Sequence, residues 1–345
     1  MEISEVQNKI LNLIKGKKPV FEGVENEWWT RDGKARVRRI VVVYNPRSSK
    51  AAIVRESVIE PLQKIKGVVF CKYEVKPTDV DDNASSLAKI LIDGDIVVTA
   101  GGDGTATIGL NGCMLSSKSV LFTALPFGNF NDMARTLKMA SGKEIYPLEA
   151  KIDGKHYRFA ACYFTIGMFA ESTEIFDNEK TRKKLQKGNK SIIFSVKTLS
   201  KWYFKNKRKR FIPSFEIVSK RKILEKDGSY VVKTKKMSGK ETKGISDYLA
   251  VNGLTVAKVM KGRKNLCFDK TSFWTATGKL NKFYRLIPFM VKSMLLKIPG
   301  KISEEDSIRF LNCKSVEIQA EGEYKKLENA KEIVISKSGK SIKIL

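Results

Sequence analysis

Histidine is almost absent from this sequence, which holds only His156 among its 345 residues. A nucleophilic mechanism built on a Ser-His or Cys-His pair would have to run through this residue. A metal cage of several histidines is excluded for the same reason. Carboxylates and backbone groups must therefore carry any chemistry.

Cysteine is scarce, and the cysteines lie far apart in the sequence. The five residues are Cys71, Cys113, Cys162, Cys267 and Cys313. Their number is odd, and no C-x-x-C pair occurs among them. The pattern argues against a zinc ribbon and favours a reducing compartment.

Long hydrophobic runs are also missing, so no transmembrane span or secretory signal is predicted. Residues 1–18 include the acidic Glu2 and Glu5, and Ile3, Val6 and Ile10 have the spacing of an amphipathic helix. A signal peptide would begin with basic residues and continue with an apolar run. We therefore expect a cytoplasmic protein.

Acidic residues are few relative to basic ones: 37 Asp and Glu against 65 Lys and Arg give a net charge of +28. This excess predicts a partner with many negative charges, such as nucleic acid, an anionic membrane surface or a polyphosphate ligand. A general enrichment in lysine is the alternative. With 42% hydrophobic residues, the chain is long and apolar enough for two folded domains.

The first half of the chain alternates strands and helices. Apolar strands are predicted at residues 40–44, 68–75, 95–100 and 120–125, and helices at residues 51–65, 82–92, 105–115 and 132–139. This βαβ order is typical of a parallel sheet with right-handed crossovers. Residues 36–142 are therefore expected to form an α/β domain, preceded by an N-terminal extension at residues 1–35.

After Pro147 the pattern changes to short strands separated by turn residues. An Asp153-Gly154 turn indicates a hairpin. Further strands are expected within residues 159–166, 215–218, 230–234, 248–251, 266–276, 316–320, 333–336 and 342–345. The spacing predicts a mostly antiparallel β-sandwich domain over residues 143–345.

Two basic amphipathic helices are predicted inside this second domain. The segment 180–210 has 13 basic residues and no acidic one. Five lysines share one face of the first helix: Lys183, Lys187, Lys190, Lys197 and Lys201. The second helix, at about residues 280–298, again carries no acid. We expect the lysine face to contact an anionic membrane surface, with a solvated basic face as the alternative.

The strongest local motif is Gly101-Gly102-Asp103-Gly104-Thr105, directly after a predicted buried strand. Ligands bind at the carboxyl edge of such sheets. Glycines at positive φ would let backbone amides approach a phosphate, and a helix would begin at Thr105. Asp103, at the apex of the loop, would hold Mg²⁺ or accept a proton. A tight turn without a ligand is the alternative, and no Walker-type motif is present.

Two more polar turns are predicted at the same edge. Asn45-Pro46-Arg47-Ser48-Ser49-Lys50 follows the first strand, and the turn from Pro126 to Asp132 follows the fourth. Either turn alone would be read as an ordinary helix cap. Their convergence with the glycine turn favours a binding site.

These motifs resemble the diacylglycerol kinase catalytic-domain family, which includes lipid kinases of the diacylglycerol and sphingosine kinase type and is related to NAD kinases. The resemblance rests on Asn45-Pro46-x-Ser48, on Gly101 to Thr105 followed by Asn111-Gly112, and on Pro126-x-Gly128-x-x-Asn131-Asp132-x-Ala134-Arg135. It implies an NAD kinase-like parallel-sheet domain that binds ATP, with Mg²⁺ as cofactor. The β-sandwich domain would help to form the cleft for the lipid. The implied enzyme transfers the γ-phosphoryl group of ATP to a lipid hydroxyl, diacylglycerol-like or sphingoid, while peripherally bound to the inner membrane surface.

The resemblance also implies roles for individual residues. The nucleotide-binding residues would be Asn45, Arg47, Ser48, Ser49, Thr78, Gly101, Gly102, Gly104, Thr105, Gly128, Asn129 and Asn131. Glu321-Gly322-Glu323 is similar to the family's Asp-Gly-Glu, which would make Glu323 the general base. Asp103 would bind Mg²⁺ through a water molecule or act as the alternative base.

The chain departs from the family pattern at four positions of its motifs: Ser49, Ile108, Phe130 and Phe169. The family's structural Mg²⁺ segment is not recognisable either. A catalytically inactive member, an NAD kinase-like enzyme and a nucleic-acid-binding protein that uses residues 180–210 are therefore the alternatives. The identity of the lipid and self-association stay open.

Overall fold

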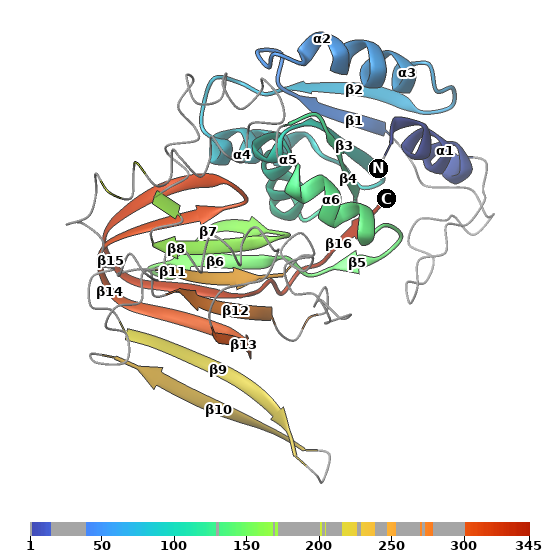
Figure 1. Cartoon of the computed structure of the whole chain (residues 1–345). Helices are drawn as coiled ribbons and strands as arrows, with labels where there is room; N and C mark the ends of the chain where they lie inside the picture. The colour runs from blue at the N-terminus through green and yellow to red at the C-terminus, as the bar shows by residue number, and fades with distance from the viewer. Residues whose placement is uncertain are drawn as a thin grey trace. The chain divides into compact units, whose positions relative to one another are not determined.

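The computed structural model describes residues 2–14, 39–128, 131–167, 170–171, 201, 204, 216–225, 229–238, 247–252, 270, 273–278 and 301–345. The chain forms two compact units (Figure 1). Unit 1 comprises Met1–Pro147, Phe159–Ala161 and Gly339–Leu345, and unit 2 comprises Leu148–Arg158 and Cys162–Ser338. The last seven residues, Gly339–Leu345, were predicted to lie in the second domain and belong to unit 1 instead.

Unit 1 is built on a six-stranded sheet with the order β2-β1-β3-β4-β16-β5. The strands are β1 (Arg39–Tyr44), β2 (Val69–Glu74), β3 (Asp95–Gly101), β4 (Leu121–Pro126), β5 (Glu144–Ile145) and β16 (Ile342–Ile344). All neighbours pair in parallel except β16 and β5. The central strands are apolar and buried, as expected for a parallel sheet covered on both faces. The predicted α/β fold class is confirmed.

The helices of unit 1 agree closely with the predicted ranges. They are α1 (Ile3–Ile14), α2 (Ala51–Val54), α3 (Glu60–Gln63), α4 (Val80–Ile90), α5 (Asp103–Ser116) and α6 (Asp132–Met139). A π-helical turn, η1 (Arg55–Ile59), connects α2 to α3. Pro61 follows this turn and has no backbone N–H to donate, which accounts for the widened turn inside a single predicted helix.

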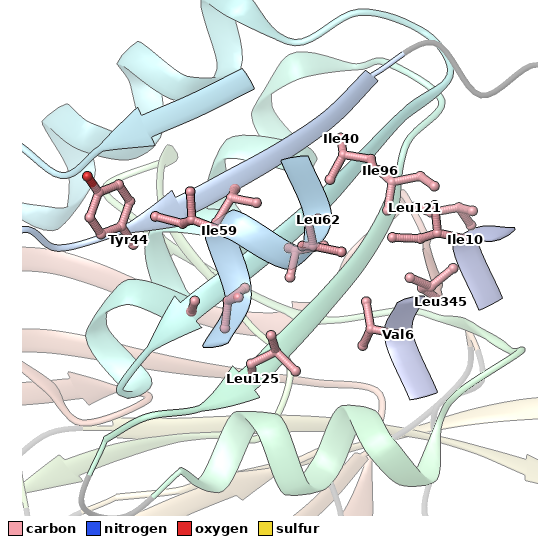
Figure 2. Packing of buried hydrophobic residues seen from close by; sticks show 14 of the residues in the cluster. Val6, Ile10, Ile40, Tyr44, Ile59, Leu62, Ile96, Leu121, Leu125 and Leu345 are labelled. Carbon is pink, nitrogen blue, oxygen red and sulfur yellow. The ribbon is translucent and has the colours of Figure 1, made fainter. Parts of the chain in front are cut away.

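The core of unit 1 includes the N-terminal helix (Figure 2). Val6 and Ile10 of α1 are fully buried in one cluster with Ile40, Leu121 and Leu345. The described part of the apolar face predicted for residues 1–18 is therefore part of this core. Burying each such side chain stabilises the folded state by roughly 1.5–3 kcal/mol, so α1 contributes to the stability of unit 1.

Unit 2 contains a single ten-stranded sheet within the described residues. Its strands are β6 (Leu148–Ile152), β7 (Lys155–Ala160), β8 (Tyr163–Gly167), β9 (Glu216–Leu224), β10 (Tyr230–Met237), β11 (Asp247–Val251), β12 (Phe273–Gly278), β13 (Lys301–Glu305), β14 (Ser307–Ala320) and β15 (Glu323–Lys337). The order is β13-β12-β11-β8-β14-β15-β6-β7, and β9 pairs with both β14 and β10. The mostly antiparallel character predicted for the β-sandwich domain is confirmed.

The predicted Asp153-Gly154 turn connects β6 to β7, with φ of 50° and 77°. Two consecutive positive φ angles are those of the type I′ turn that suits a hairpin.

The predicted basic helices lie mostly outside the described residues. Lys183, Lys187, Lys190 and Lys197 are not described, nor are residues 280–298, whereas Lys201 is exposed and helical. No described helix is both long enough and apolar enough to cross a bilayer.

Candidate active site

Three loops leave the carboxyl edge of the sheet of unit 1. Tyr44 pairs with Ala100, and Gly101 pairs with Pro126. The chain therefore leaves β1, β3 and β4 at neighbouring points, and the three predicted turns come together at one edge. This is where ligands bind in open α/β sheets.

The loop after β1 is organised by its own polar groups. The Oδ1 atom of Asn45 accepts a hydrogen bond of 3.0 Å from the Arg47 N–H, and the Ser48 N–H donates to the Asn45 carbonyl over 3.1 Å. Arg47, Ser48 and Ser49 are exposed. Asn45 thus shapes the loop, while a guanidinium and two hydroxyls remain accessible to a ligand.

The glycines of the second loop serve close packing between loops, and none of them is needed for a positive φ angle. Gly102 has φ of −87°, and Gly101, Gly102 and Gly104 all lie outside the positive-φ region. A Cβ atom on Gly128 would lie 2.4 Å from the Cα atom of Gly102. The second and third loops are therefore in backbone contact, and the expectation of positive φ in this turn was wrong.

Thr105 occupies the space beside Gly101. A Cβ atom on Gly101 would lie 2.5 Å from the Oγ1 atom of Thr105. Thr105 also lies inside α5, because the helix begins two residues earlier than predicted, at Asp103. Position 101 must therefore be glycine, because any side chain there would clash with Thr105, the last residue of the motif.

Asp103 is the first residue of α5, so its predicted place at a loop apex was wrong. Its Oδ1 atom accepts a hydrogen bond of 3.0 Å from the backbone N–H of Met133 in α6. Asn131, the residue at the N-cap of α6, makes no capping hydrogen bond with its side chain. Asp103 therefore caps α6 from another helix, and its negative charge suits the positive end of the α6 dipole.

Burial raises the pKa of Asp103 to about 6. The hydrogen bond from the Met133 N–H lowers this pKa, and the nearby Asp132 carboxylate raises it. The Asn131 N–H and the Arg135 guanidinium make smaller contributions, and both lower the pKa. Arg135 forms an ion pair with Asp132 over 2.5 Å. The Asp103 carboxyl group therefore changes its protonation state close to neutral pH. A cation bound beside it would favour its ionised form.

Asn131 and Lys50 both hold the backbone of Gly128. The Oδ1 atom of Asn131 accepts from the Gly128 N–H over 2.6 Å, and its Nδ2 atom donates to the Gly128 carbonyl over 2.9 Å. The Nζ atom of Lys50 donates to the same carbonyl over 3.5 Å. The first and third loops are therefore linked by Lys50, which was absent from the predicted binding residues although it ends the first motif.

Thr78 is exposed, and a buried asparagine holds it in place. The Nδ2 atom of Asn83 donates to the Thr78 Oγ1 atom over 2.9 Å, and its Oδ1 atom accepts from the Lys76 N–H over 2.8 Å. The role of Asn83 was not predicted, because a single asparagine in a helix forms no motif. Asn83 is a positioning residue for the loop that carries Thr78.

Asn111 and Gly112, which follow the glycine turn, have structural roles. The Asn111 amide accepts from the Phe159 N–H over 2.8 Å and donates to the Phe159 carbonyl over 3.0 Å. A Cβ atom on Gly112 would lie 2.6 Å from Leu87 of α4. These residues fix α5 against its neighbours and thereby fix Asp103.

The Glu321-Gly322-Glu323 motif forms a tight turn between β14 and β15 in unit 2. Glu321 and Gly322 have φ of 52° and 91°, and Ala320 pairs with Glu323. Glu321 is buried, and its Oε1 atom accepts a hydrogen bond from the Cys162 N–H. Glu323 is half-buried. The sharp turn agrees with the prediction, whereas the role of Glu323 as a base stays a prediction.

The four departures from the family pattern differ in their surroundings. Ile108 is buried within α5, so its apolar side chain belongs to the core of unit 1. Ser49 is exposed in the first loop. Phe130 and Phe169 lie outside the described residues, as does the predicted binding residue Asn129.

The described residues fit ATP with Mg²⁺ at this edge. They contain no cluster of three or more His, Cys, Asp or Glu side chains that could hold a metal ion alone. Mg²⁺ is usually held by one or two carboxylates together with substrate phosphates and water molecules. Asp103 supplies one such carboxylate, and the amino end of α5 with Arg47 and Lys50 supplies groups that attract phosphate.

Comparison with known proteins agrees with this geometry. The family model "Diacylglycerol kinase catalytic domain" matches residues 39–162, so the resemblance seen in the motifs is confirmed. A solved structure from Bacillus anthracis str. Sterne, described as "a putative diacylglycerol kinase", has 15% identity and a TM-score of 0.54, covering 88% of this chain and 96% of its own. Another, described as a diacylglycerol kinase from the same strain, has 16% identity and a TM-score of 0.53, with the same coverage. At this identity the two structures show the fold. No curated protein matches the chain.

Proposed function

We propose that this chain is an ATP-dependent lipid kinase, which transfers the γ-phosphoryl group of ATP to the hydroxyl group of a diacylglycerol-like or sphingoid lipid. The match of residues 39–162 to a kinase catalytic domain supports phosphoryl transfer. The observation that carries the proposal is the hydrogen bond from the Met133 N–H to Asp103, which fixes a carboxylate among three converging polar loops. Such a carboxylate would repel phosphates unless it served a cation or a proton transfer.

The residues of the first loop would bind the phosphates. Arg47 is exposed, and Lys50 lies at the junction of the first and third loops through its contact with the Gly128 carbonyl. Both cations attract the negative charge of a nucleotide, and the first backbone amides of α5 add to this attraction. When bound, Mg²⁺ would neutralise charge on the transferring phosphoryl group, and Asp103 is the described residue suited to orient it through a water molecule.

The acceptor hydroxyl needs a base, and we assign this role to Glu323. The assignment rests on the Glu321-Gly322-Glu323 motif, which lies beyond the residues matched by the family model. Glu321 is engaged with the Cys162 N–H, whereas Glu323 begins β15 immediately after the turn. A base on this turn would accept the proton as the hydroxyl oxygen attacks the γ-phosphorus atom in line.

A lipid substrate places the enzyme at a membrane surface, and the net charge of +28 favours an anionic one. We therefore propose a cytoplasmic enzyme bound peripherally to the inner membrane surface.

The proposal is tested by incubating the purified protein with Mg²⁺, γ-labelled ATP and a total lipid extract. Organic extraction and mass spectrometry would then identify any labelled product. We expect a phosphorylated lipid. Label in NADP⁺ after supplying NAD⁺, with none in lipid, would favour the NAD kinase-like alternative, and label in neither would support a catalytically inactive member.

A further inference from the structure

The β9–β10 ribbon of unit 2 extends beyond the sheet to which it belongs (Figure 1). Residues 216–220 of β9 pair with residues 307–311 of β14. In the described part of the chain, residues 221–224 of β9 pair only with β10, and β10 pairs only with β9. Half of the ribbon is therefore anchored on β14, and the other half projects as a two-stranded hairpin.

Residues 231–236 of the strand β10 are exposed on both faces of the strand. Residues 231–236 are all exposed, although successive side chains of a strand point to opposite faces. Val231 and Val232, in the projecting half, are 42% and 51% exposed. A two-stranded hairpin is marginally stable at best in water. A projecting hairpin with two adjacent exposed valines is thus suited to a partner that covers it.

The charge of the ribbon restricts the choice of partner. The two strands carry six basic residues and one acidic residue, Glu216. The basic residues are Lys220, Arg221, Lys222, Lys233, Lys235 and Lys236. Three lysines of β10 are exposed next to the two valines. The partner must therefore accept apolar side chains beside a dense negative charge.

We propose that the β9–β10 hairpin docks on an anionic lipid bilayer with the outer edge of β10 toward the membrane, so that Val231 and Val232, on opposite faces of the strand, both reach the interface and the lysines of β10 contact the head groups. This inference deepens the proposed function, on which its biological meaning rests, because a lipid kinase acts at a bilayer. A second copy pairing along β10 would bring like charges together, which is unfavourable. Single-stranded nucleic acid is bound by aromatic stacking as well as charge, whereas the apolar side chains described as exposed on β10 are those of Val231 and Val232.

The test uses the full chain and vesicles of phosphatidylcholine, with or without phosphatidylglycerol. The variant K233Q/K235Q/K236Q removes three positive charges from β10. The matched control K64Q/K66Q/K89Q removes three exposed lysines from unit 1. Each lysine near an anionic surface contributes on the order of 1 kcal/mol, so the hairpin variant should lose about 100-fold in binding to anionic vesicles, and the control less than about threefold.

A second variant tests the apolar part. V231T/V232T keeps β-branched side chains, so the strand should persist. At high salt, where the charge contribution is screened, we expect this variant to bind anionic vesicles more weakly than the wild type. Thermal unfolding of both variants should match that of the wild type.

Equal vesicle binding by the hairpin variant and its control would overturn the proposal. So would a hairpin variant that loses binding to single-stranded RNA and keeps its binding to vesicles, which would assign the ribbon to nucleic acid. Phosphorylation of a short-chain, water-soluble lipid is measured separately. Its absence would contradict the proposed function and leave the docking result intact.

Discussion

The Oδ1 atom of Asp103, in the first turn of α5, accepts a hydrogen bond of 3.0 Å from the backbone N–H of Met133, in the first turn of α6. One carboxyl group thereby joins the loop after β3 to the loop after β4. Because Asn131 provides no side-chain cap, the start of α6 depends on a residue 30 positions away in the sequence. A structural role and a proposed catalytic role thus meet in Asp103, and substitutions can separate them.

Asparagine and alanine at position 103 should differ in stability. Asp103→Asn keeps an oxygen that accepts from the Met133 N–H, whereas Asp103→Ala removes the cap. Loss of such a cap costs about 1 kcal/mol, so we expect Asp103→Ala to be less stable than Asp103→Asn by that amount at pH 7. Urea denaturation followed by circular dichroism measures the difference. Equal stability of the two variants would show that this hydrogen bond does not support α6.

The stability of the fold should depend on pH through Asp103. Burial raises its pKa in the folded state to about 6, whereas an unfolded aspartate titrates near ~4. Protonated Asp103 therefore makes its full contribution to the free energy of unfolding below about pH 4. This contribution is lost as the pH rises through about 6. Relative to Asp103→Asn, the wild type should lose on the order of 2 kcal/mol between pH 4 and 7.

This prediction is checked by measuring the free energy of unfolding of the wild type and of Asp103→Asn at several pH values. Taking the difference between them removes the contributions of the other titrating groups. A difference that is constant between pH 4 and 7, or one that changes in the opposite direction, would contradict a raised pKa of Asp103.

The contact between Gly102 and Gly128 should be sensitive to one added methyl group. A Cβ atom at position 128 would lie 2.4 Å from the Gly102 Cα atom, which forces the two loops apart. We expect Gly128→Ala to weaken ATP binding at least about tenfold and to destabilise the fold by about 1–3 kcal/mol. Isothermal titration calorimetry with ATP and Mg²⁺ measures the affinity. Gly339→Ala is the control, because nothing lies within 4 Å of its Cβ position.

The order of elements could be predicted from the sequence because buried strands and amphipathic helices leave local patterns. The range predicted for α6, residues 132–139, is the observed one. The reason for the glycines was not predicted correctly, since the contact between Gly102 and Gly128 is made between two loops distant in the sequence. No local pattern could reveal it.

Other parts of the site depended on tertiary contacts in the same way. The interaction of Asn83 with Thr78 and the capping of α6 by Asp103 are made by single polar residues without periodicity. The short apolar run at residues 342–345 indicated a strand, but not that it would pair with β4 in unit 1. A strand of three residues carries too little pattern to choose its sheet.

The two glutamates of the turn between β14 and β15 should respond differently to substitution. Glu323→Gln should lower the rate of lipid phosphorylation by about 10²-fold or more with nearly unchanged ATP affinity, because a base acts on the acceptor hydroxyl. Glu321→Gln should chiefly reduce stability, since the Glu321 carboxylate is buried against the Cys162 N–H. Steady-state kinetics and thermal unfolding of both variants measure these effects. Full activity of the Glu323→Gln variant would remove Glu323 from the mechanism.

The central claim is that the site around Asp103 transfers the γ-phosphoryl group of ATP to a lipid hydroxyl. The most direct measurement compares wild type and Asp103→Asn with Mg²⁺, a lipid extract and ATP labelled at either the γ- or the α-phosphate, and counts label in the organic phase. We predict that label enters lipid from the γ-position alone, and that Asp103→Asn reduces its rate by at least about 10²-fold. Absence of lipid label in the wild type, or an equal rate in the variant, would contradict the account.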